Sequence, residues 1–346
     1  MVIHGLRGAD LQSIPEWLSD VLVCPRDRMS VERRGDTLVC GPGHEYPIVD
    51  GVPVMLVEEV ARTHPYCEST LAAVKRGGGT AERATAMGSD DVDDFVQQEI
   101  VKTNGFLYQE LKGSLKRYPI PDIRLPAGEG KTLLDVGCNW GRWTVSAARK
   151  GYRAVGLDPS LDAVLAATRV ALALNVETWH VVGDARMLPF AERSFAVGYS
   201  YGVFQHFSKE HANEAIAELA RVTEMSGTVL VQMANRFGLR QAYNATRAWI
   251  SSNDDEFRIR YWTPRELQTT FARLVGPCEL SVDGFFALNP QPADLDMLAR
   301  RYAAVVRTSE ALRRLAARQR CRLVGHVADS VYVRAEKELH GGLQTE

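Results

Sequence analysis

The chain has 346 residues, with 41 Lys and Arg against 43 Asp and Glu, so its formal net charge is -2. This balance gives no global nucleic-acid signature, and the 45% share of hydrophobic residues is ample for a buried core. The length suits two or three domains.

No apolar run reaches the ~18 residues that a membrane-spanning helix needs. The first residues lack a basic stretch leading into an apolar core, so we expect no secretory signal. The six cysteines stand at irregular positions, which favours reduced thiols over a disulfide framework. We therefore expect a cytoplasmic protein.

Residues 18–57 are expected to form a compact β-rich unit of their own. Two knuckle-like turns, CPRD and CGPGH, precede a strand, a turn and a strand over residues 46–56. Each knuckle carries residue types that ligate metals. The four candidate ligands are Cys24, Asp27, Cys40 and His44.

This segment resembles the small zinc-ribbon-like proteins that activate transfer-RNA methyltransferases, and the ribbon fused ahead of some ribosomal-RNA methyltransferases. In both, paired cysteines usually hold a metal. Here the second position of the first knuckle is Asp27, and structural zinc sites favour thiolate and imidazole over carboxylate. Two alternatives stay open: a ribbon that binds zinc, and one that kept its apolar core and lost the metal.

Residues 58–129 are predicted to be a helical linker. Between Asp93 and Arg117 the apolar spacing predicts one or two amphipathic helices. Their apolar positions are Phe95, Ile100, Phe106, Leu107, Leu111 and Leu115.

The stretch TLLDVGCNWGRWTVSAARKGYRAVGLDPS, residues 132–160, predicts a strand, a glycine-containing turn, a helix and a second strand. Gly137 and Gly141 let the backbone pass close to a ligand, and the following helix points its free N–H groups at the same place. Asp158 lies about 20 residues past Gly137, a spacing at which an acidic residue meets ribose hydroxyls.

The dinucleotide fingerprint needs three glycines as G-x-G-x-x-G, and only two are present here, spaced G-x-x-x-G. A nicotinamide cofactor is therefore disfavoured. The chain instead resembles the class I S-adenosylmethionine-dependent methyltransferases, through five motifs in order over residues 130 to 235. These motifs are LLDVGCNWG, GLDPS, VGDARMLPF, SFAV and ELARVTEMSGTVL.

The resemblance implies an α/β fold: a Rossmann-like seven-stranded methyltransferase sheet, with the β-rich ribbon and helical linker ahead of it. The methyltransferase domain is expected over residues 130–338, with insertions at 235–262 and 293–320. In related enzymes, helices ahead of the core form a lid over the cofactor. The linker could do the same, or it could only join the ribbon to the core.

The resemblance also assigns S-adenosylmethionine contacts. Asp135 would face the methionyl amine, Asp158 would accept the ribose hydroxyls, and Asp184 would take the adenine amino group. The Ala185 backbone would meet the adenine ring, while Asn139 stands where many relatives have glycine. The full cofactor set is Asp135, Gly137, Asn139, Gly141, Asp158, Asp184 and Ala185.

Residues 199–207 follow the fourth strand, where this fold places its acceptor chemistry. A hydroxyl acceptor must lose a proton, and His206 is the candidate general base. The alternative is that His206 caps the next helix or only packs. Candidate substrate-side groups here are Tyr199, Tyr201 and Gln205. The chain lacks the Asn/Asp-Pro-Pro-aromatic motif of many amine methyltransferases.

The insertion over 235–262 is rich in cations and aromatics and is expected to wall the acceptor pocket, although a solvated amphipathic helix is an open alternative. We expect it to contact an anionic or polyhydroxylated substrate, through Arg236 and Tyr261 in particular. The other cationic and aromatic residues of this insertion are Arg240, Tyr243, Arg247, Arg258, Arg260 and Trp262. Directly after it, Thr263 and Pro264 predict a helix start.

The sequence therefore predicts a methyltransferase that acts on a small molecule, on a hydroxyl of a sugar or specialised metabolite. RNA methylation is the alternative that the ribbon and the basic insertions favour and that the charge balance opposes. A third alternative is a catalytically idle partner that activates another methyltransferase through its ribbon.

Overall fold

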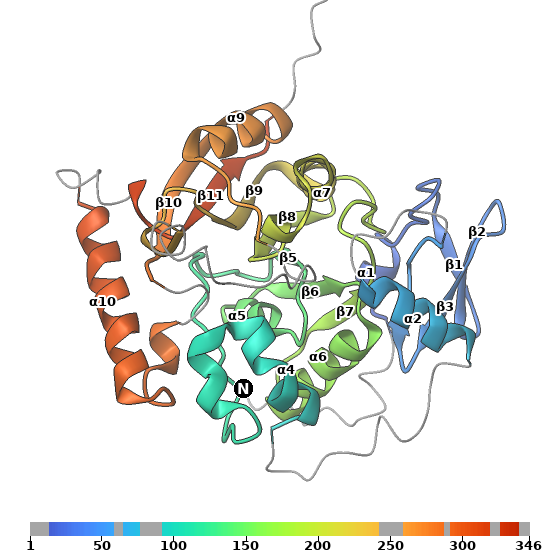
Figure 1. Ribbon diagram of the computed structural model, residues 1–346. Helices are drawn as coiled ribbons and strands as arrows, with labels where there is room; N and C mark the ends of the chain where they lie inside the picture. Colours follow the sequence, from blue (N-terminus) through green and yellow to red (C-terminus); the bar gives the residue numbers. More distant parts are fainter. Residues whose placement is uncertain are drawn as a thin grey trace, which may run out of the picture.

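The computed structural model describes residues 14–58, 65–76, 92–241, 259–286, 291–318 and 326–338. These residues form two sheets, shown in Figure 1. The small sheet has the strand order β1-β2-β3-β4, and the large sheet has the order β10-β11-β9-β8-β5-β6-β7.

The small sheet belongs to the N-terminal ribbon and is antiparallel throughout. Val49 pairs with Val52 across a two-residue turn, in which Asp50 and Gly51 both have positive φ, as a tight hairpin requires. The turn chemistry of this Asp-Gly pair therefore sets the register of the last hairpin. The elements are α1 (Glu16–Ser19), β1 (Val31–Arg34), β2 (Thr37–Cys40), β3 (Glu45–Val49) and β4 (Val52–Pro53).

The large sheet has five strands that pair in parallel, followed at one edge by β11, which is antiparallel to both of its neighbours, and by β10, which therefore runs in the same direction as the five. The parallel strands read as apolar runs because both of their faces are buried. They are β5 (Thr132–Val136), β6 (Arg153–Asp158), β7 (Trp179–Val182), β8 (Phe195–Tyr201) and β9 (Thr223–Ala234). The antiparallel pair is β10 (Cys278–Gly284) and β11 (Ser330–Glu336). This sheet confirms the predicted Rossmann-like fold.

Helices cover both faces of the large sheet (Figure 1). On one face lie α5 (Arg142–Arg149) and α6 (Leu161–Ala173), which make the crossovers from β5 to β6 and from β6 to β7. On the other lie α7 (Lys209–Val222) and α9 (Pro264–Leu274). Because the chain moves outward from β5 in one direction and returns through β8 in the other, the strand order reverses between β5 and β8. A ligand in such a sheet binds at this reversal, beyond the carboxyl ends of the strands.

Helix α9 shows how a local signal fixes an element's start. Thr263 accepts a hydrogen bond from the Glu266 backbone, the Glu266 side chain accepts one from the Thr263 backbone, and Pro264 occupies the first turn. The predicted helix start is thus confirmed.

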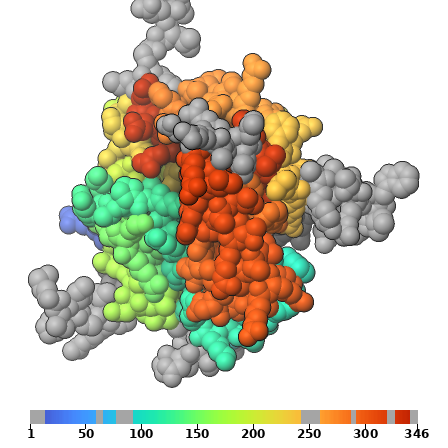
Figure 2. All heavy atoms as spheres, turned by 90° about the vertical axis from the view of Figure 1, so that its left-hand side faces the viewer, coloured from blue at the N-terminus to red at the C-terminus, as the bar shows by residue number. Residues whose placement is uncertain are grey.

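The linker and the helical part between β10 and β11 lie side by side, as Figure 2 shows. The linker contains α2 (Pro65–Lys75), α4 (Asp94–Asn104) and the 3-10 helix η2 (Phe106–Leu111), and the other part contains η5 (Pro292–Asp294) and α10 (Arg300–Ala316). Buried between them, Arg142 at the start of α5 pairs with Asp294, with 2.6 Å between Nη2 and Oδ2. The domain limits 18–57, 58–129 and 130–338 stay predictions.

A short segment of the ribbon pairs with β7, the edge strand of the large sheet. Val54 forms a parallel bridge with Val182 of β7, and the Met55 backbone N–H donates to the Val182 carbonyl at 2.8 Å. Leu18 and Leu22 bury their side chains in the same apolar cluster as Leu157 of β6. No helix in the described ranges is long and apolar enough to cross a membrane.

Candidate functional site

The turn between β5 and α5 has three residues with positive φ: Gly137 at 80°, Asn139 at 47° and Gly141 at 81°. A Cβ added to Gly137 would lie 2.2 Å from Cγ2 of Val203. The Gly137 N–H is held by the Leu157 carbonyl at 2.7 Å. The glycine therefore allows both the backbone conformation and the close approach of the segment after β8.

Two buried carboxylates flank this turn, at the ends of neighbouring strands. Asp158 accepts hydrogen bonds from the backbone N–H groups of Asn139 and Ser160, both at 3.0 Å. Asp135 accepts one from Thr144 Oγ at 2.7 Å. Burial raises the pKa of Asp135 to about 7 and that of Asp158 to about 6. Hydrogen-bond donors and positive charge on a ligand would offset the cost of burying these charges.

This arrangement fits the ribose and the amino group of S-adenosylmethionine, since both are donors and the two carboxylates are acceptors. The sequence interpretation missed Thr144, although a hydroxyl on a helix face otherwise filled with alanine and valine was a usable signal. The contacts that the resemblance assigns to Asp135, Gly137, Asn139, Gly141 and Asp158 stay predictions.

Asp184 lies in the loop after β7, as expected, but it already has a strong partner. Its Oδ2 accepts from Arg186 Nη2 at 2.7 Å, and its Oδ1 accepts from the Arg186 backbone N–H at 2.9 Å. Ala185 is buried beside it. Contacts between this pair and adenine stay predictions, and any adenine contact of Asp184 would have to coexist with the ion pair.

His206 lies in the 3-10 helix η3 (Phe204–His206), directly after β8. Its backbone N–H donates to the Val203 carbonyl at 2.9 Å, and the Arg260 side chain donates to its carbonyl. The neighbouring Gln205 is 3% exposed. The backbone of Gln205 and His206 is thus held by contacts from two separate parts of the chain.

Tyr199 and Tyr201 point into the sheet face under α5. Tyr199 is 0% exposed, and its hydroxyl lies 3.1 Å from that of Tyr332. The Tyr201 hydroxyl donates to Asp283 at 2.8 Å, and its ring lies 4.4 Å from that of Trp143 between centroids. A direct substrate contact therefore stays a prediction for both tyrosines.

The two ends of the predicted insertion at 235–262 meet, because Asn235 and Trp262 form a parallel bridge. Arg236 is exposed, and Tyr261 is half-buried, which raises the pKa of its hydroxyl. The predicted contributions of Tyr243, Arg247 and Arg258 lie outside the described residues.

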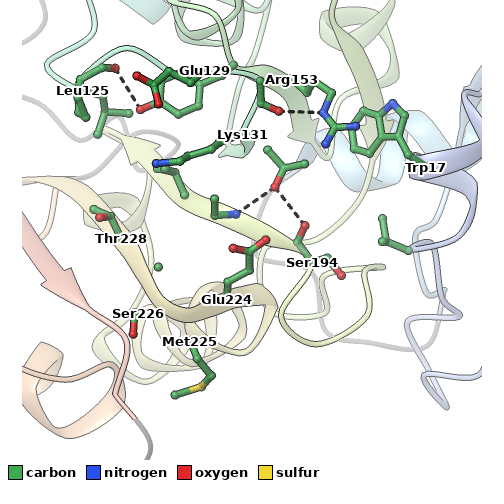
Figure 3. Close-up of a pocket in the computed structure, with 18 of the residues that line it drawn as sticks. Trp17, Leu125, Glu129, Lys131, Arg153, Ser194, Glu224, Met225, Ser226 and Thr228 are labelled. Atoms are coloured by element: carbon green, nitrogen blue, oxygen red, sulfur yellow. Dashed lines mark hydrogen bonds between the residues drawn. The ribbon is translucent and has the colours of Figure 1, made fainter.

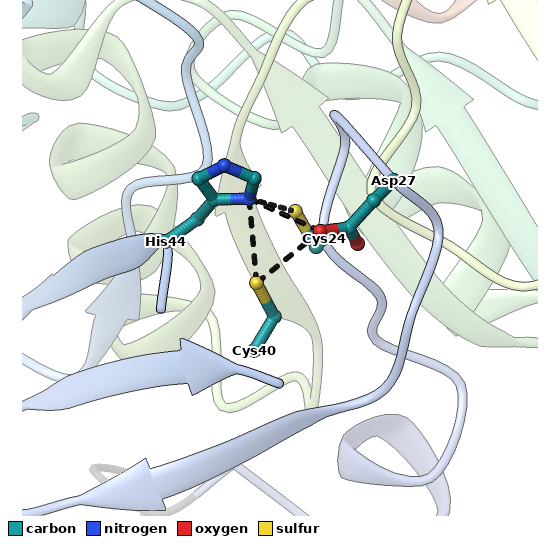
Figure 4. Close-up of side chains that lie close together, drawn as sticks. All are labelled: Cys24, Asp27, Cys40 and His44. Atoms are coloured by element: carbon teal, nitrogen blue, oxygen red, sulfur yellow. Dashed lines mark hydrogen bonds and ion pairs between the residues drawn. The ribbon is translucent and has the colours of Figure 1, made fainter. Parts of the chain in front are cut away.

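The four ribbon side chains proposed as ligands converge, as Figure 4 shows. One atom from each lies within 4.8 Å of all the others. His44 Nδ1 is 3.5 Å from Cys24 Sγ, 3.4 Å from Cys40 Sγ and 3.1 Å from Asp27 Oδ2. Cys40 Sγ is 3.4 Å from the same Asp27 oxygen. The two knuckles, which are 13 positions apart from Asp27 to Cys40, thus form a cluster with two thiols, one imidazole and one carboxylate.

A cavity of about 710 Å³ lies at the opposite edge of the large sheet, at the amino ends of β5, β6 and β8 (Figure 3). Its lining includes Lys131, Ser194 and Arg153, whose guanidinium lies 5.1 Å from the Trp17 ring centroid. Because Asp135 and Asp158 stand at the other ends of these strands, this cavity is separate from the candidate cofactor site.

Comparison with known proteins agrees with the fold. Residues 133–227 match the family model described as a methyltransferase domain, a stretch that contains the glycine turn, Asp158, Asp184 and His206. The chain therefore contains a class I S-adenosylmethionine-dependent methyltransferase domain.

The ribbon has relatives of its own. It is 45% identical over 47 residues to a UPF0434 protein of Vesicomyosocius okutanii subsp. Calyptogena okutanii (strain HA), a match that covers 13% of this chain and 80% of that protein. A UPF0434 protein of Paraburkholderia phymatum is 43% identical over 49 residues, covering 13% of this chain and 73% of that protein. Through this segment the chain belongs to the UPF0434 family, joined here to a methyltransferase domain.

Solved structures of similar fold include a methyltransferase of Thermotoga maritima, at 13% identity and a TM-score of 0.41, covering 78% of this chain and 99% of that one. Another comes from the complex of the Haloferax volcanii Trm112 methyltransferase activator with a methyltransferase, at 18% identity and a TM-score of 0.42, covering 71% of this chain and 95% of that one.

Proposed function

We propose that the protein methylates a hydroxyl oxygen of a small molecule, a sugar or a specialised metabolite. When bound at the glycine turn, S-adenosylmethionine supplies an electrophilic methyl carbon on a sulfonium. Asp135, Gly137, Asn139, Gly141 and Asp158 would hold this cofactor, which would give up its methyl group to the acceptor oxygen and keep the electron pair of the carbon–sulfur bond on sulfur. The chain's own tasks are to hold the acceptor in line and to receive its proton.

The observation that carries this proposal is the placement of Gln205 and His206 directly after β8, the strand next to β5 at the strand-order reversal. Gln205 Oε1 is buried, and among the described residues it has no hydrogen-bond donor. An acceptor of this kind suits a hydroxyl on the substrate. His206 would then receive the proton from the hydroxyl that is methylated.

Replacing His206 with Gln tests this role. We expect turnover to fall by about 10²- to 10⁴-fold, because that is the usual contribution of a positioned base. The affinity for S-adenosylhomocysteine should stay within about twofold, a change below 0.5 kcal/mol. The acid limb of the pH–rate profile, along which the imidazole takes up a proton, should vanish in the variant. Unchanged turnover would remove His206 as the base.

The acceptor class is tested by calorimetric titration with S-adenosylhomocysteine, with and without structured RNA. We expect micromolar binding that RNA does not alter, at about -8 kcal/mol. Binding that tightens only with RNA would contradict a small-molecule acceptor. Hydroxylated metabolites can then be screened with the labelled methyl donor.

We also infer that Cys24, Asp27, Cys40 and His44 hold a structural zinc ion. In a tetrahedral zinc site with bonds of about 2.0 to 2.3 Å, ligand atoms lie roughly 3.3 to 3.8 Å apart. The separations of 3.4 and 3.5 Å support this geometry, and that of 3.1 Å is close to it. Four protein ligands would leave no open position, which favours a structural role over a catalytic one.

A further inference from the structure

The segment from Val182 to Ala191 is attached to the ribbon at both of its ends. At its start, the Val182 carbonyl accepts from the Met55 N–H at 2.8 Å. At its end, the Pro189 carbonyl accepts from the Val23 N–H at 3.0 Å, and the Ala191 N–H donates to the Val21 carbonyl at 2.8 Å. The loop between these points carries Asp184 and Ala185, the predicted adenine contacts. Its path is therefore set by the ribbon as well as by the large sheet.

Glu218 of α7 makes a third attachment to this loop. Its side chain is 11% exposed, and Oε2 accepts from the Leu188 backbone N–H at 3.1 Å. Arg221 donates to the same carboxylate at 2.8 Å and also to the Leu188 carbonyl at 2.9 Å. Burial works against its charge, but Arg221 and then Arg28 outweigh that effect, so that the pKa of Glu218 is lowered.

Arg28 extends this network into the candidate metal site. Its Nη2 donates to Glu218 Oε1 at 2.8 Å, across 190 positions of sequence. Arg28 directly follows Asp27 and has a positive φ of 61°, and its backbone N–H donates to the Cys24 carbonyl at 2.8 Å. Two of the four candidate metal ligands, Cys24 and Asp27, thus belong to the turn that positions Arg28. A change in the position of Cys24 or Asp27 would therefore reach Arg28 through this turn.

We propose that Arg28 and Glu218 are positioning residues, which couple the metal site of the ribbon to the adenine side of the cofactor site. With the metal site filled, the turn holds Arg28 on Glu218, Glu218 holds Leu188, and the loop carrying Asp184 keeps its binding conformation. Filling the ribbon site therefore tightens cofactor binding without any contact between metal and cofactor. This inference rests on the proposed cofactor and zinc sites.

The test compares R28A, R28K and E218Q with wild type, using S-adenosylhomocysteine and adenosine as calorimetric probes. We expect about a 3-fold loss of affinity for R28A, since its ion pair is half-exposed, and partial rescue in R28K. For E218Q we expect about a 10-fold loss, since it breaks charge-assisted hydrogen bonds in a buried place. Both probes should weaken by the same factor, because both contain the adenine. The matched control is R33A, whose guanidinium belongs to β1 and lies 3.8 Å from Asp36.

Zinc content and chelation separate coupling from general damage. R28A should retain one zinc per chain, and removing zinc should weaken binding by wild type but add little to the loss in R28A. Equal losses on chelation in both proteins, or wild-type affinity in R28A, would overturn the coupling. If wild type itself fails to bind S-adenosylhomocysteine, the proposed function fails instead. Should E218Q not fold, R28A and R28K still decide the question.

Discussion

The glycine turn and the ribbon cluster are both prepared to bind a ligand, but in different ways. In the glycine turn, Asp135 and Asp158 are held by hydrogen bonds from their own surroundings, so they stay in place and carry raised pKa values. In the ribbon cluster, the polar contacts of His44 and Cys40 run largely to the other candidate ligands. In the glycine turn, burying the two carboxylates costs free energy that a ligand with donors or positive charge would offset. In the ribbon cluster, the four side chains already surround a position that an ion would fill.

This difference indicates which of the two sites needs its ligand for the fold to be stable. The glycine turn belongs to the core of a seven-stranded sheet and keeps its form through backbone hydrogen bonds. The ribbon is a small four-stranded unit with less surface to bury, and small units often need a metal. Loss of zinc should therefore lower stability in addition to weakening cofactor binding, whereas loss of the cofactor contacts should affect binding alone.

The largest effect is expected from removing the metal. Chelation should lower the unfolding free energy by about 4 kcal/mol relative to protein in zinc at 1,000 times its dissociation constant. Replacing Cys40 with Ser should have the same effect and abolish the bound zinc, measured by elemental analysis and thermal unfolding. The control is Cys278→Ser, a free thiol of β10 away from the ribbon. Equal stability with and without zinc would show that the ribbon lost its metal.

Next is the replacement of Asp158 with Ala. Because a carboxylate that accepts two ribose hydroxyls contributes about 1.5 to 3 kcal/mol for each bond, S-adenosylhomocysteine affinity should fall at least about 100-fold. Thermal stability should change little, since removing a buried charge offsets the loss of two backbone hydrogen bonds. Asp122→Asn is the control, because that side chain is 87% exposed. Unchanged affinity in calorimetry would defeat the assignment of Asp158.

A smaller effect is expected for Gly137→Ala. The added Cβ would meet Val203 at 2.2 Å in a backbone conformation that alanine disfavours, at a cost of about 1 to 3 kcal/mol. Adding Val203→Ala should recover the loss of stability that comes from the steric clash, but not the loss that comes from the positive φ. Denaturant unfolding of the single and double variants measures the two contributions. A single variant as stable as wild type would show that the turn can move.

The smallest effect is a pH dependence with opposite signs for stability and binding. Asp135 and Asp158 have folded pKa values of about 7 and 6, above the value of 3.8 for an unperturbed carboxyl. Between pH 4 and 7 the folded protein binds more protons, so their contribution to stability falls as the pH rises. Cofactor binding needs the charged form of both groups, so affinity should drop by up to about tenfold per unit between pH 7 and 6, and by up to a further tenfold per unit below pH 6. Asp158→Asn should flatten that drop, and a flat wild-type profile would contradict it.

Sequence reasoning found the sheet because its signals are local. Apolar runs, the two glycines and the spacing to Asp158 predicted the strand, turn, helix and second strand that β5, α5 and β6 form within residues 132–160. Strand β9 begins at Thr223, ahead of the apolar run that starts after Thr228, because its first residue pairs with Phe195 ahead of a register shift. A partner strand creates such an extension, and the extended residues themselves carry no sign of it.

The candidate sites were predicted less evenly. A strand that is buried on both faces has no alternation, so the sequence could not tell which way Tyr199 and Tyr201 point. The tertiary structure turns them toward Trp143 and Tyr332. The Asp184–Arg186 pair was also missed, although the two residues are only two positions apart.

By itself the sequence determined the methyltransferase fold and the cofactor turn, because hydrophobic period and glycine placement act over a few residues. It also supplied the four candidate metal ligands of the ribbon by residue type. Only the tertiary structure decided that these ligands meet and that Arg28 reaches Glu218. Contacts between residues far apart in the chain depend on how whole elements pack, and packing leaves no pattern in either segment alone.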